Sequence, residues 1–235
     1  ILKRFTSNLF KAITTGFLAT SIVQSSSLIT VIVISFLSVE LLTLAQGIGI
    51  VFGSNLGSTT TAWIVSSLGL KIKISAYAMP MLIFGVVLRF FKNNTYKGLG
   101  NVLLGLGFIF LGISYMKDGF DTLKDSIDLA QFALPGIKGI ILYILIGAVA
   151  TIVIQSSSAT MAIIITALSA GNIIYINALA LAIGANIGTT VTAIIGSFAS
   201  NENGKRLAFA HLIFNVITAL VAVIFIYSLK DFVDY

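Results

Sequence analysis

Residues 20–27 read TSIVQSSS, and residues 151–158 read TIVIQSSS. Both stretches place a glutamine and three serines inside an otherwise apolar segment. The chain of 235 residues is 57% hydrophobic and only 9% charged, and its mean hydropathy is +1.07. Because soluble domains carry about 25% charged residues, this composition indicates a membrane protein. The polar interruptions are therefore the feature that needs a physical explanation.

The two stretches belong to a longer internal repeat. Residues 16–67 align with residues 147–198 without a gap, and 19 of the 52 aligned positions are identical. The identities gather in the polar interruptions: Gln24 with Gln155, Ser25–Ser27 with Ser156–Ser158, Gly53 with Gly184, Asn55 with Asn186, Gly57 with Gly188, Thr59 with Thr190, and Thr61 with Thr192. One interpretation is that small polar residues only let helices pack closely. Two copies in register favour a duplicated binding site.

The apolar runs are of two kinds. Uninterrupted runs at about 73–91, 98–116 and 206–229 approach the roughly 20 residues that a helix needs to cross the hydrocarbon core. Other runs are divided into shorter pieces, by QSSS in 14–37 and 147–168, by GSNLGSTT in 43–68, and by GANIGTT in 174–198. Residues 117–131 would place Phe120, Leu123 and Ile127 on one face of a helix and the acidic residues on the other, which predicts an amphipathic helix at the membrane interface.

We interpret each QSSS as the tip of a re-entrant helical hairpin and each later interruption as the break in a transmembrane helix. Three membrane spans then lie between equivalent positions of the two copies, and an odd number of spans inverts the second copy. If the QSSS segments crossed the membrane instead, the number would be four and the two copies would have the same orientation. The predicted fold is an all-α membrane protein with two inverted-topology repeats, residues 1–97 and 98–235, and intact scaffold helices. The counterpart of 98–116 would precede Ile1, so we expect the first repeat to continue before it.

Broken helices in a bilayer must line a polar cavity or be buried in protein, because lipid cannot satisfy their free backbone groups. Helix C-termini offer carbonyl oxygens to a cation, and helix N-termini offer N–H groups to an anion. Ser26, Ser27, Ser157 and Ser158 are good N-caps for the second helix of each pair, and Asn55 and Asn186 can serve either ion. The four glycines of these segments, at 53, 57, 184 and 188, are expected to let the backbone unwind and approach a ligand.

No charged residue lies within the four interruptions. Neutral oxygen ligands suit an alkali cation better than a transition metal, and the chain has no cysteine for a thiolate site. An anion and cations that neutralise one another in the pocket would give coupled binding. His211, the single histidine, is either a structural residue or a group for proton coupling or gating. Asn215, one turn later, is interpreted as a packing hydrogen bonder.

The duplicated QSSS, followed 28 positions after its first serine by GSNLGSTTTA or GANIGTTVTA, resembles the type II sodium-phosphate cotransporter family. The resemblance covers about residues 10–215, including FLGISYMKDGFDTL before the second copy and AFAHLIFN after it. Members of this family are similar in carrying two inverted copies that form phosphate and sodium sites. The first copy departs from the pattern, since Ser54 and Ser58 stand where GANIGT is usual.

The resemblance implies a role for particular residues in each copy. It implies phosphate contacts at Ser25, Ser26, Ser27, Ser156, Ser157 and Ser158, to which the amides of Asn55 and Asn186 are added on chemical grounds. It implies sodium contacts at Gln155, Ser156, Thr189 and Thr192, with a symmetry-related set at Gln24, Ser25, Ser58 and Thr61.

The predicted function is therefore secondary active transport, with inorganic phosphate and sodium ions as substrates moved together by alternating access. We expect no organic cofactor, no catalytic residues and no nucleic-acid partner. We expect a multi-pass protein of the inner cell membrane and a homodimer in the lipid bilayer. The alternatives are a sodium-coupled transporter of another small anion, a non-transporting membrane scaffold, and an intramembrane serine hydrolase that uses a QSSS serine with His211.

Overall fold

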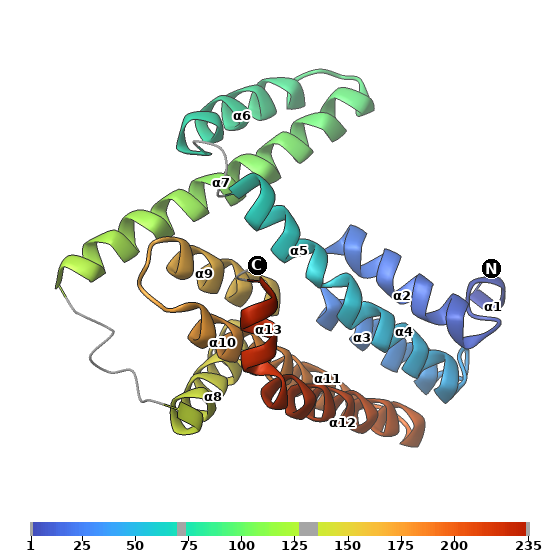
Figure 1. Cartoon of the computed structure of the whole chain (residues 1–235). Coiled ribbons are helices and arrows are strands. Elements are labelled where there is room, and N and C mark those ends of the chain that lie inside the picture. Colours follow the sequence, from blue (N-terminus) through green and yellow to red (C-terminus); the bar gives the residue numbers. More distant parts are fainter. Residues whose placement is uncertain (1, 70–73, 127–135, 234–235) are drawn as a thin grey trace. The chain divides into compact units, whose positions relative to one another are not determined.

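A computed structural model describes residues 2–69, 74–126 and 136–233. All regular structure in these ranges is helical (Figure 1). The helices are α1 (Leu2–Phe5), α2 (Leu9–Val23), α3 (Ser26–Ser38), α4 (Leu44–Gly57), α5 (Thr59–Ile64), the π-helix η1 (Val65–Gly69), α6 (Ile74–Arg89), α7 (Asn94–Ser126), α8 (Gly136–Ile154), α9 (Ser157–Ser169), α10 (Tyr175–Gly188), α11 (Thr190–Ser197), α12 (Glu202–Ile224) and α13 (Ile226–Val233).

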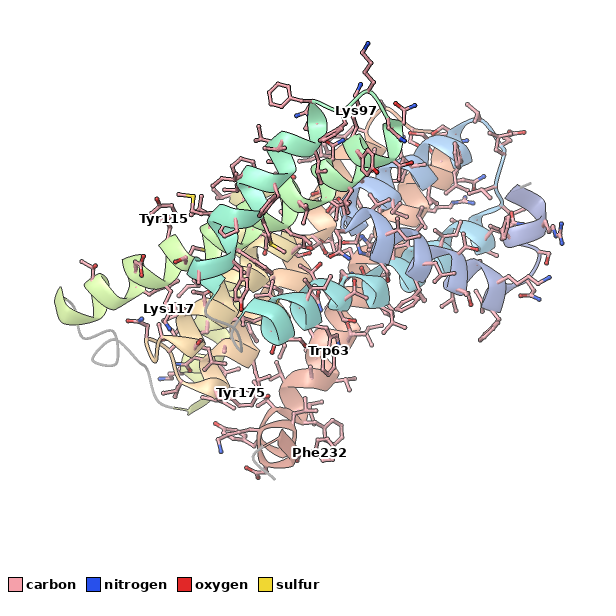
Figure 2. All side chains as sticks on the ribbon, turned by 90° about the horizontal axis from the view of Figure 1, so that it is seen from above. Trp63, Lys97, Tyr115, Lys117, Tyr175 and Phe232 are labelled. Atoms are coloured by element: carbon pink, nitrogen blue, oxygen red, sulfur yellow. The ribbon has the colours of Figure 1, made fainter. Side chains whose placement is uncertain are left out.

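Four helical segments are long and apolar enough to cross a membrane: Asn94–Phe120, Gly136–Ile154, Tyr175–Ser197 and Glu202–Ile224. Large apolar side chains stand out from the helices (Figure 2), and several are mostly exposed, such as Ile22 at 80% and Val153 at 76%. Water would not tolerate so much exposed hydrocarbon on a folded surface, whereas lipid does. The prediction of a multi-pass, all-helical membrane protein is confirmed.

Two compact units divide the chain. The first contains residues 1–62, 133–164 and 174–235, and the second contains residues 63–132 and 165–173. The first unit holds both QSSS stretches. The division into repeats at residue 97 is a statement about duplicated sequence, and it stays a prediction.

The tightest packing in the first unit is the crossing of α2 with α4, which lie side by side in Figure 1. A Cβ placed on Gly16 would lie 1.9 Å from the carbonyl oxygen of Ile50, and one placed on Gly53 would lie 1.8 Å from that of Ile13. Only glycine permits such an approach of backbone to backbone. On either side of this crossing, a Cβ on Gly49 would meet Ala12 and one on Gly57 would meet Thr20. These outer contacts advance in the same direction along both helices, so α2 and α4 run parallel.

The second copy repeats this crossing between α8 and α10. A Cβ on Gly147 would lie 2.1 Å from the carbonyl oxygen of Leu181, and one on Gly184 would lie 1.9 Å from that of Ile144. Each contact is shifted by 131 positions from its counterpart in α2 and α4. The duplication of sequence is thus also a duplication of helix packing.

The first copy turns back on itself at Gln24 and Ser25. Gly47 faces Leu37 and Val33, whereas Ser54 bonds the carbonyl of Ser26. These contacts run in opposite order along the two helices, so α3 is antiparallel to α4. Since α2 is parallel to α4, α2 and α3 form a helical hairpin.

The core of the first unit lies where this hairpin meets the end of the second copy. Val33, Ile34 and Leu37 of α3 pack with Ala193 of α11 and Leu207 of α12. At one end of this contact, the hydroxyls of Ser38 and Ser200 are 2.6 Å apart, and the amide of Asn201 donates to the carbonyl of Leu37 at 3.0 Å.

The second unit is built on α6 and α7, which pack along their length. The expected span 98–116 and interface helix 117–131 are not separate helices, because α7 continues without a break through Ser126; residues 127–131 lie outside the described residues. The expected span 73–91 corresponds to α6, which has 16 residues.

Two other predicted boundaries differ from the structure. The run 206–229 is divided, because α12 ends at Ile224 and α13 begins at Ile226. The helix before the second QSSS begins at Gly136 and has 19 residues, so it is long enough to cross a membrane by itself. Its counterpart α2 has 15 residues.

The glycine crossings give a first prediction. Gly16→Ala and Gly147→Ala force a Cβ into a backbone carbonyl of the neighbouring helix. Because neither backbone can move away easily, each variant should lower the free energy of unfolding by about 2 kcal/mol or more, as overpacking does. Thermal unfolding of the purified protein in detergent measures the change. Gly105→Ala is the matched control, because nothing lies within 4 Å of a Cβ at Gly105. Equal melting temperatures for all three variants would contradict the assigned role of the crossings.

Candidate functional site

Each QSSS begins with a glutamine in the left-handed region of backbone conformation. The φ angle is 58° at Gln24 and 57° at Gln155. Each glutamine side chain folds back to donate to a carbonyl of the preceding helix, that of Ser21 or Ile152, at 2.5 Å in both copies. This conformation usually belongs to glycine at a helix C-terminus. The side-chain bonds therefore hold a strained turn that ends the first helix of each pair.

The same glutamines reach the second interruption of their own copy. Thr61 donates its hydroxyl to Oε1 of Gln24 at 2.6 Å, and Thr192 donates to Oε1 of Gln155 at 2.9 Å. Two members of each predicted sodium set are thus in direct contact. Amide and hydroxyl oxygens at this separation are ligands of the kind that a small hard cation accepts.

The serines that follow act as helix caps. Ser25 accepts the backbone N–H of Leu28 at 3.2 Å, and Ser156 accepts that of Ala159 at 3.2 Å. The N-cap role predicted for Ser26, Ser27, Ser157 and Ser158 belongs instead to the preceding serine in each copy. The later serines therefore stand at the open N-terminal ends of α3 and α9, where backbone N–H groups lack helical partners.

The later interruptions are shallower than expected. Ser58 and Thr189, the single residues between the paired helices, both keep right-handed helical angles, with φ of −65° and −62°. Ser58 Oγ donates to the carbonyl of Asn55 at 2.7 Å, and Thr189 Oγ1 donates to that of Asn186 at 2.6 Å. The expectation of an unwound backbone is therefore wrong at these two positions. Hydroxyls satisfy the carbonyls that unwinding would have exposed.

The glycines of the interruptions also have a different role from the one predicted. Gly53 and Gly184 belong to the helix crossings, and a Cβ on Gly57 or Gly188 would lie 2.6 Å from the carbonyl oxygen of Phe17 or Ala148. These glycines therefore bring helices together.

A pocket of about 220 Å³ lies where the second QSSS meets the later interruption of the first copy. Ser157 and Ser158 at the start of α9 form one wall, Ser58 and Thr59 another, and Asn186 of α10 a third. Apolar side chains complete the lining: Ala62, Met161, Leu179, Ala182, Ile183, Ala222, Ile226 and Leu229. In the part of the chain that the structure describes, no charged side chain lines this pocket.

The two QSSS tips meet at Ser158. Its hydroxyl lies 3.1 Å from that of Thr61 and 3.5 Å from the carbonyl oxygen of Gln24. A residue of the second copy thus contacts the glutamine and threonine of the first.

The pocket contains only part of the predicted anion set. Ser157, Ser158 and Asn186 line it, together with Ser58 from the predicted sodium set. The first-copy members of the predicted anion set do not line the pocket. Ser26 is 6% exposed and packs near Ser54, and the side chain of Asn55 is hydrogen-bonded to His211 and Asn215. Thr59 and the eight apolar lining residues were not in the predicted sets. Thr59 could have been found from its identity with Thr190 in the repeat, but Ile226 has no such signal.

Comparison with known proteins identifies the chain. A sequence model described as "Na+/Pi-cotransporter" matches residues 1–118 and 136–232. The chain belongs to the Na+/Pi-cotransporter family. The resemblance stated from the QSSS and GxNxGxT segments is thereby confirmed, and this Na+/Pi-cotransporter family member carries its pocket between the two motif types.

Curated relatives extend over most of the chain. It is 32% identical over 98% of its length to "Uncharacterized protein YqeW" of Bacillus subtilis, of which the match covers 73%. It is also 32% identical to "Putative inorganic phosphate export protein YjbB" of Salmonella typhimurium and of Escherichia coli, over 93% and 92% of the chain. The chain spans only 40% and 39% of those two proteins. No solved structure matches it.

The left-handed glutamines give a second prediction. Gln155→Ala and Gln155→Gly both remove the bonds to Ile152 and Thr192, but alanine must also adopt a positive φ, which costs about 1 kcal/mol relative to glycine. The alanine variant should therefore melt at a lower temperature than the glycine variant in detergent. A higher melting temperature for Gln155→Ala would mean that the turn does not keep this conformation.

Proposed function

We propose that the protein is a secondary active transporter that couples inorganic phosphate to sodium ions by alternating access. The observation that carries this proposal is the uncharged pocket at the start of α9, whose polar lining residues are Ser157, Ser158, Asn186, Ser58 and Thr59. Membership of the Na+/Pi-cotransporter family supports the choice of substrates. The printed names of two relatives, which refer to phosphate export, support phosphate as the anion.

The pocket suits an anion that arrives with its own counter-ions. The N–H groups at the start of α9, together with its positive dipole end, favour negative charge. Serine and threonine hydroxyls can donate to the anion while their lone pairs face a cation. Since no charged side chain lines the pocket among the described residues, bound cations would supply the missing positive charge. Coupling of sodium to phosphate follows from this neutralisation.

For sodium we propose the glutamine–threonine pairs, with Ser25 and Ser58 in the first copy and Ser156 and Thr189 in the second. In each pair the amide Oε1 and threonine Oγ1 are already within 2.9 Å. The first pair adjoins the pocket, because Thr61 also contacts Ser158 at 3.1 Å. The second pair, Gln155 with Thr192, is more exposed.

The direction of the helices supports inverted repeats with re-entrant hairpins. Gly47 faces Leu207, and Asn55 contacts Asn215, so α4 and α12 run parallel. A short turn joins α11 to α12 and the two pack together, so α11 runs opposite to α4. The later helices of the two copies thus have opposite directions, as an inverted duplication requires.

Equivalent positions of the two copies differ in exposure, which supports alternating access. Thr190 and Ala193 of α11 are each 1% exposed, because α11 packs against α3. Their counterparts Thr59 and Ala62 line the pocket. One half-site is thus closed while its equivalent is open. Exchange of these two arrangements would open the site alternately to the two sides of the membrane.

The alternatives have less support. An intramembrane serine hydrolase needs a histidine beside the nucleophile, but Nε2 of His211 is 3.2 Å from Oδ1 of Asn55, an amide. A scaffold has no need of a pocket that gathers hydroxyl and amide groups where two duplicated motifs meet. Another small anion, such as sulfate, would suit the same hydroxyls, and competition experiments separate it from phosphate. A homodimer in the inner cell membrane belongs to the same proposal.

The third prediction tests transport. The full-length protein in proteoliposomes should carry labelled phosphate in response to a sodium gradient, with both uptake and efflux measured. Ser157→Ala/Ser158→Ala should reduce the flux by about tenfold or more, since hydrogen bonds to a charged ligand contribute about 1.5–3 kcal/mol. Ser35→Ala is the control, because its hydroxyl bonds only its own helix at Val31. The absence of any sodium-driven flux would refute the proposal.

The fourth prediction tests alternating access. A Cβ on Gly196 of α11 would lie 3.2 Å from Cγ2 of Val31 on α3, which is close enough for a disulfide in Val31→Cys/Gly196→Cys. Oxidation should lock the closed half-site and stop transport, and reduction should restore it. Each single variant is the control, since neither can form the bond. Unimpaired transport by the fully cross-linked protein would show that α3 and α11 need not separate.

A further inference from the structure

A buried polar ring joins α12 to the first copy. His211, 2% exposed, places Nε2 3.2 Å from Oδ1 of Asn55. Asn55 donates from Nδ2 to Oδ1 of Asn215 at 3.3 Å, and Asn215 donates from its own Nδ2 to the carbonyl of His211 at 2.9 Å. Each member therefore bonds the next, and the ring closes.

The ring assigns the histidine a single role. With the amide of Asn55 oriented to donate to Asn215, its Oδ1 can only accept, so Nε2 of His211 carries the proton. Nδ1 is buried and has no partner among the described residues. His211 thus acts as a fixed donor to Asn55.

The bond from His211 reaches the pocket through the backbone of Asn55. The carbonyl of Asn55 accepts the hydroxyl of Ser58 at 2.7 Å, and Ser58 lines the pocket beside Thr59. Phe52, one turn earlier, stacks on Phe214 of α12 with ring centroids 4.1 Å apart. The end of α4 is therefore held on α12 by a polar ring and an aromatic pair.

The α12 residues that form this anchor are not duplicated in the other copy. The positions 131 residues before His211 and Asn215 are Pro80 and Phe84, which cannot form the ring. The counterpart of Asn55 is Asn186, which is exposed and lines the pocket, and no hydrogen bond of its side chain lies within the described ranges. The duplicated asparagines therefore have different surroundings.

We propose that His211 is a positioning residue that fixes Asn55 and the wall formed by Ser58 and Thr59, and that Asn186 alone of the two asparagines contacts the transported anion. The second clause rests on the proposed function, whereas the first does not. The two equivalent asparagines thus have different roles. Asn55 supports the pocket wall, and Asn186 recognises the anion.

The anchor is tested without transport. Residues 1–235 contain no cysteine, so Thr59→Cys, in a full-length protein freed of any other cysteine, reports on the pocket wall through its rate of reaction with a water-soluble methanethiosulfonate. His211→Leu should change this rate by at least about threefold, the lower range of coupling between contacting residues. His211→Gln, which keeps a donor, should restore it. Ala182→Cys, on the α10 wall, is the control reporter and should not respond.

A rate at Thr59→Cys that is the same in His211→Leu and the parent would overturn the anchor, as would an equal response at Ala182→Cys. If His211→Leu does not yield folded protein, Asn215→Leu opens the same ring and should give the same change. The reactivity measurement at Thr59→Cys tests the anchor even if the protein carries no phosphate.

The recognition clause is tested by double-mutant cycles on phosphate flux. His211→Leu and Asn55→Leu break the same bond, so their effects should be non-additive by at least about threefold. His211→Leu and Asn186→Leu should be additive, and only Asn186→Leu should raise the phosphate concentration at half-maximal flux when His211 is intact. Additivity of the first pair, or equal effects of Asn55→Leu and Asn186→Leu on half-saturation, would refute the division of roles.

Discussion

Backbone contact between helices, made possible by glycine, is the constraint on which the first unit depends. Gly16 against Ile50 and Gly53 against Ile13 leave no room for a side chain, and the second copy repeats both contacts. At this distance a one-residue slip of either helix would bring a Cβ into a carbonyl. The register of α2 on α4, and of α8 on α10, is therefore fixed. It sets the QSSS tips level with the later interruptions, so that a glutamine meets a threonine in each copy.

Much of this arrangement could be predicted from the internal repeat. A gapless offset of 131 showed which polar residues were duplicated. The resemblance to the sodium-phosphate cotransporter family placed Gln24 with Thr61 and Gln155 with Thr192, and the structure brings both pairs into contact. The glycines were misinterpreted because unwinding and close helix packing need the same residue, and sequence does not distinguish them. The depth of the interruptions was overestimated for a related reason. A hydroxyl that bonds the carbonyl three residues earlier lets a helix keep its angles where glycine and asparagine suggested that it would open.

Features without a counterpart in the other copy could not be predicted in this way. His211 faces Asn55 only because α12 runs parallel to α4, a relation between distant segments that no local pattern records. The contribution of Ile226 to the pocket depends on the end of α12 at Ile224, inside a stretch, residues 219–226, that is apolar at every position. The repeat predicts which residue type occurs at an equivalent position, but the packing of distant helices decides what that residue contacts. This is why Asn55 is held in a ring while Asn186 lines the pocket.

The left-handed glutamines also match the chain to the thickness of a bilayer. A continuous helix from Leu9 to Ser38 would be about 45 Å long at about 1.5 Å per residue, and one from Gly136 to Ser169 would be longer still. The hydrocarbon core is about 30 Å thick. Without the change of sign in φ at Gln24 and Gln155, each apolar run would have to tilt steeply or project from the lipid. One backbone angle in each copy thus divides one very long helix into two shorter helices, whose junction is free to carry polar groups.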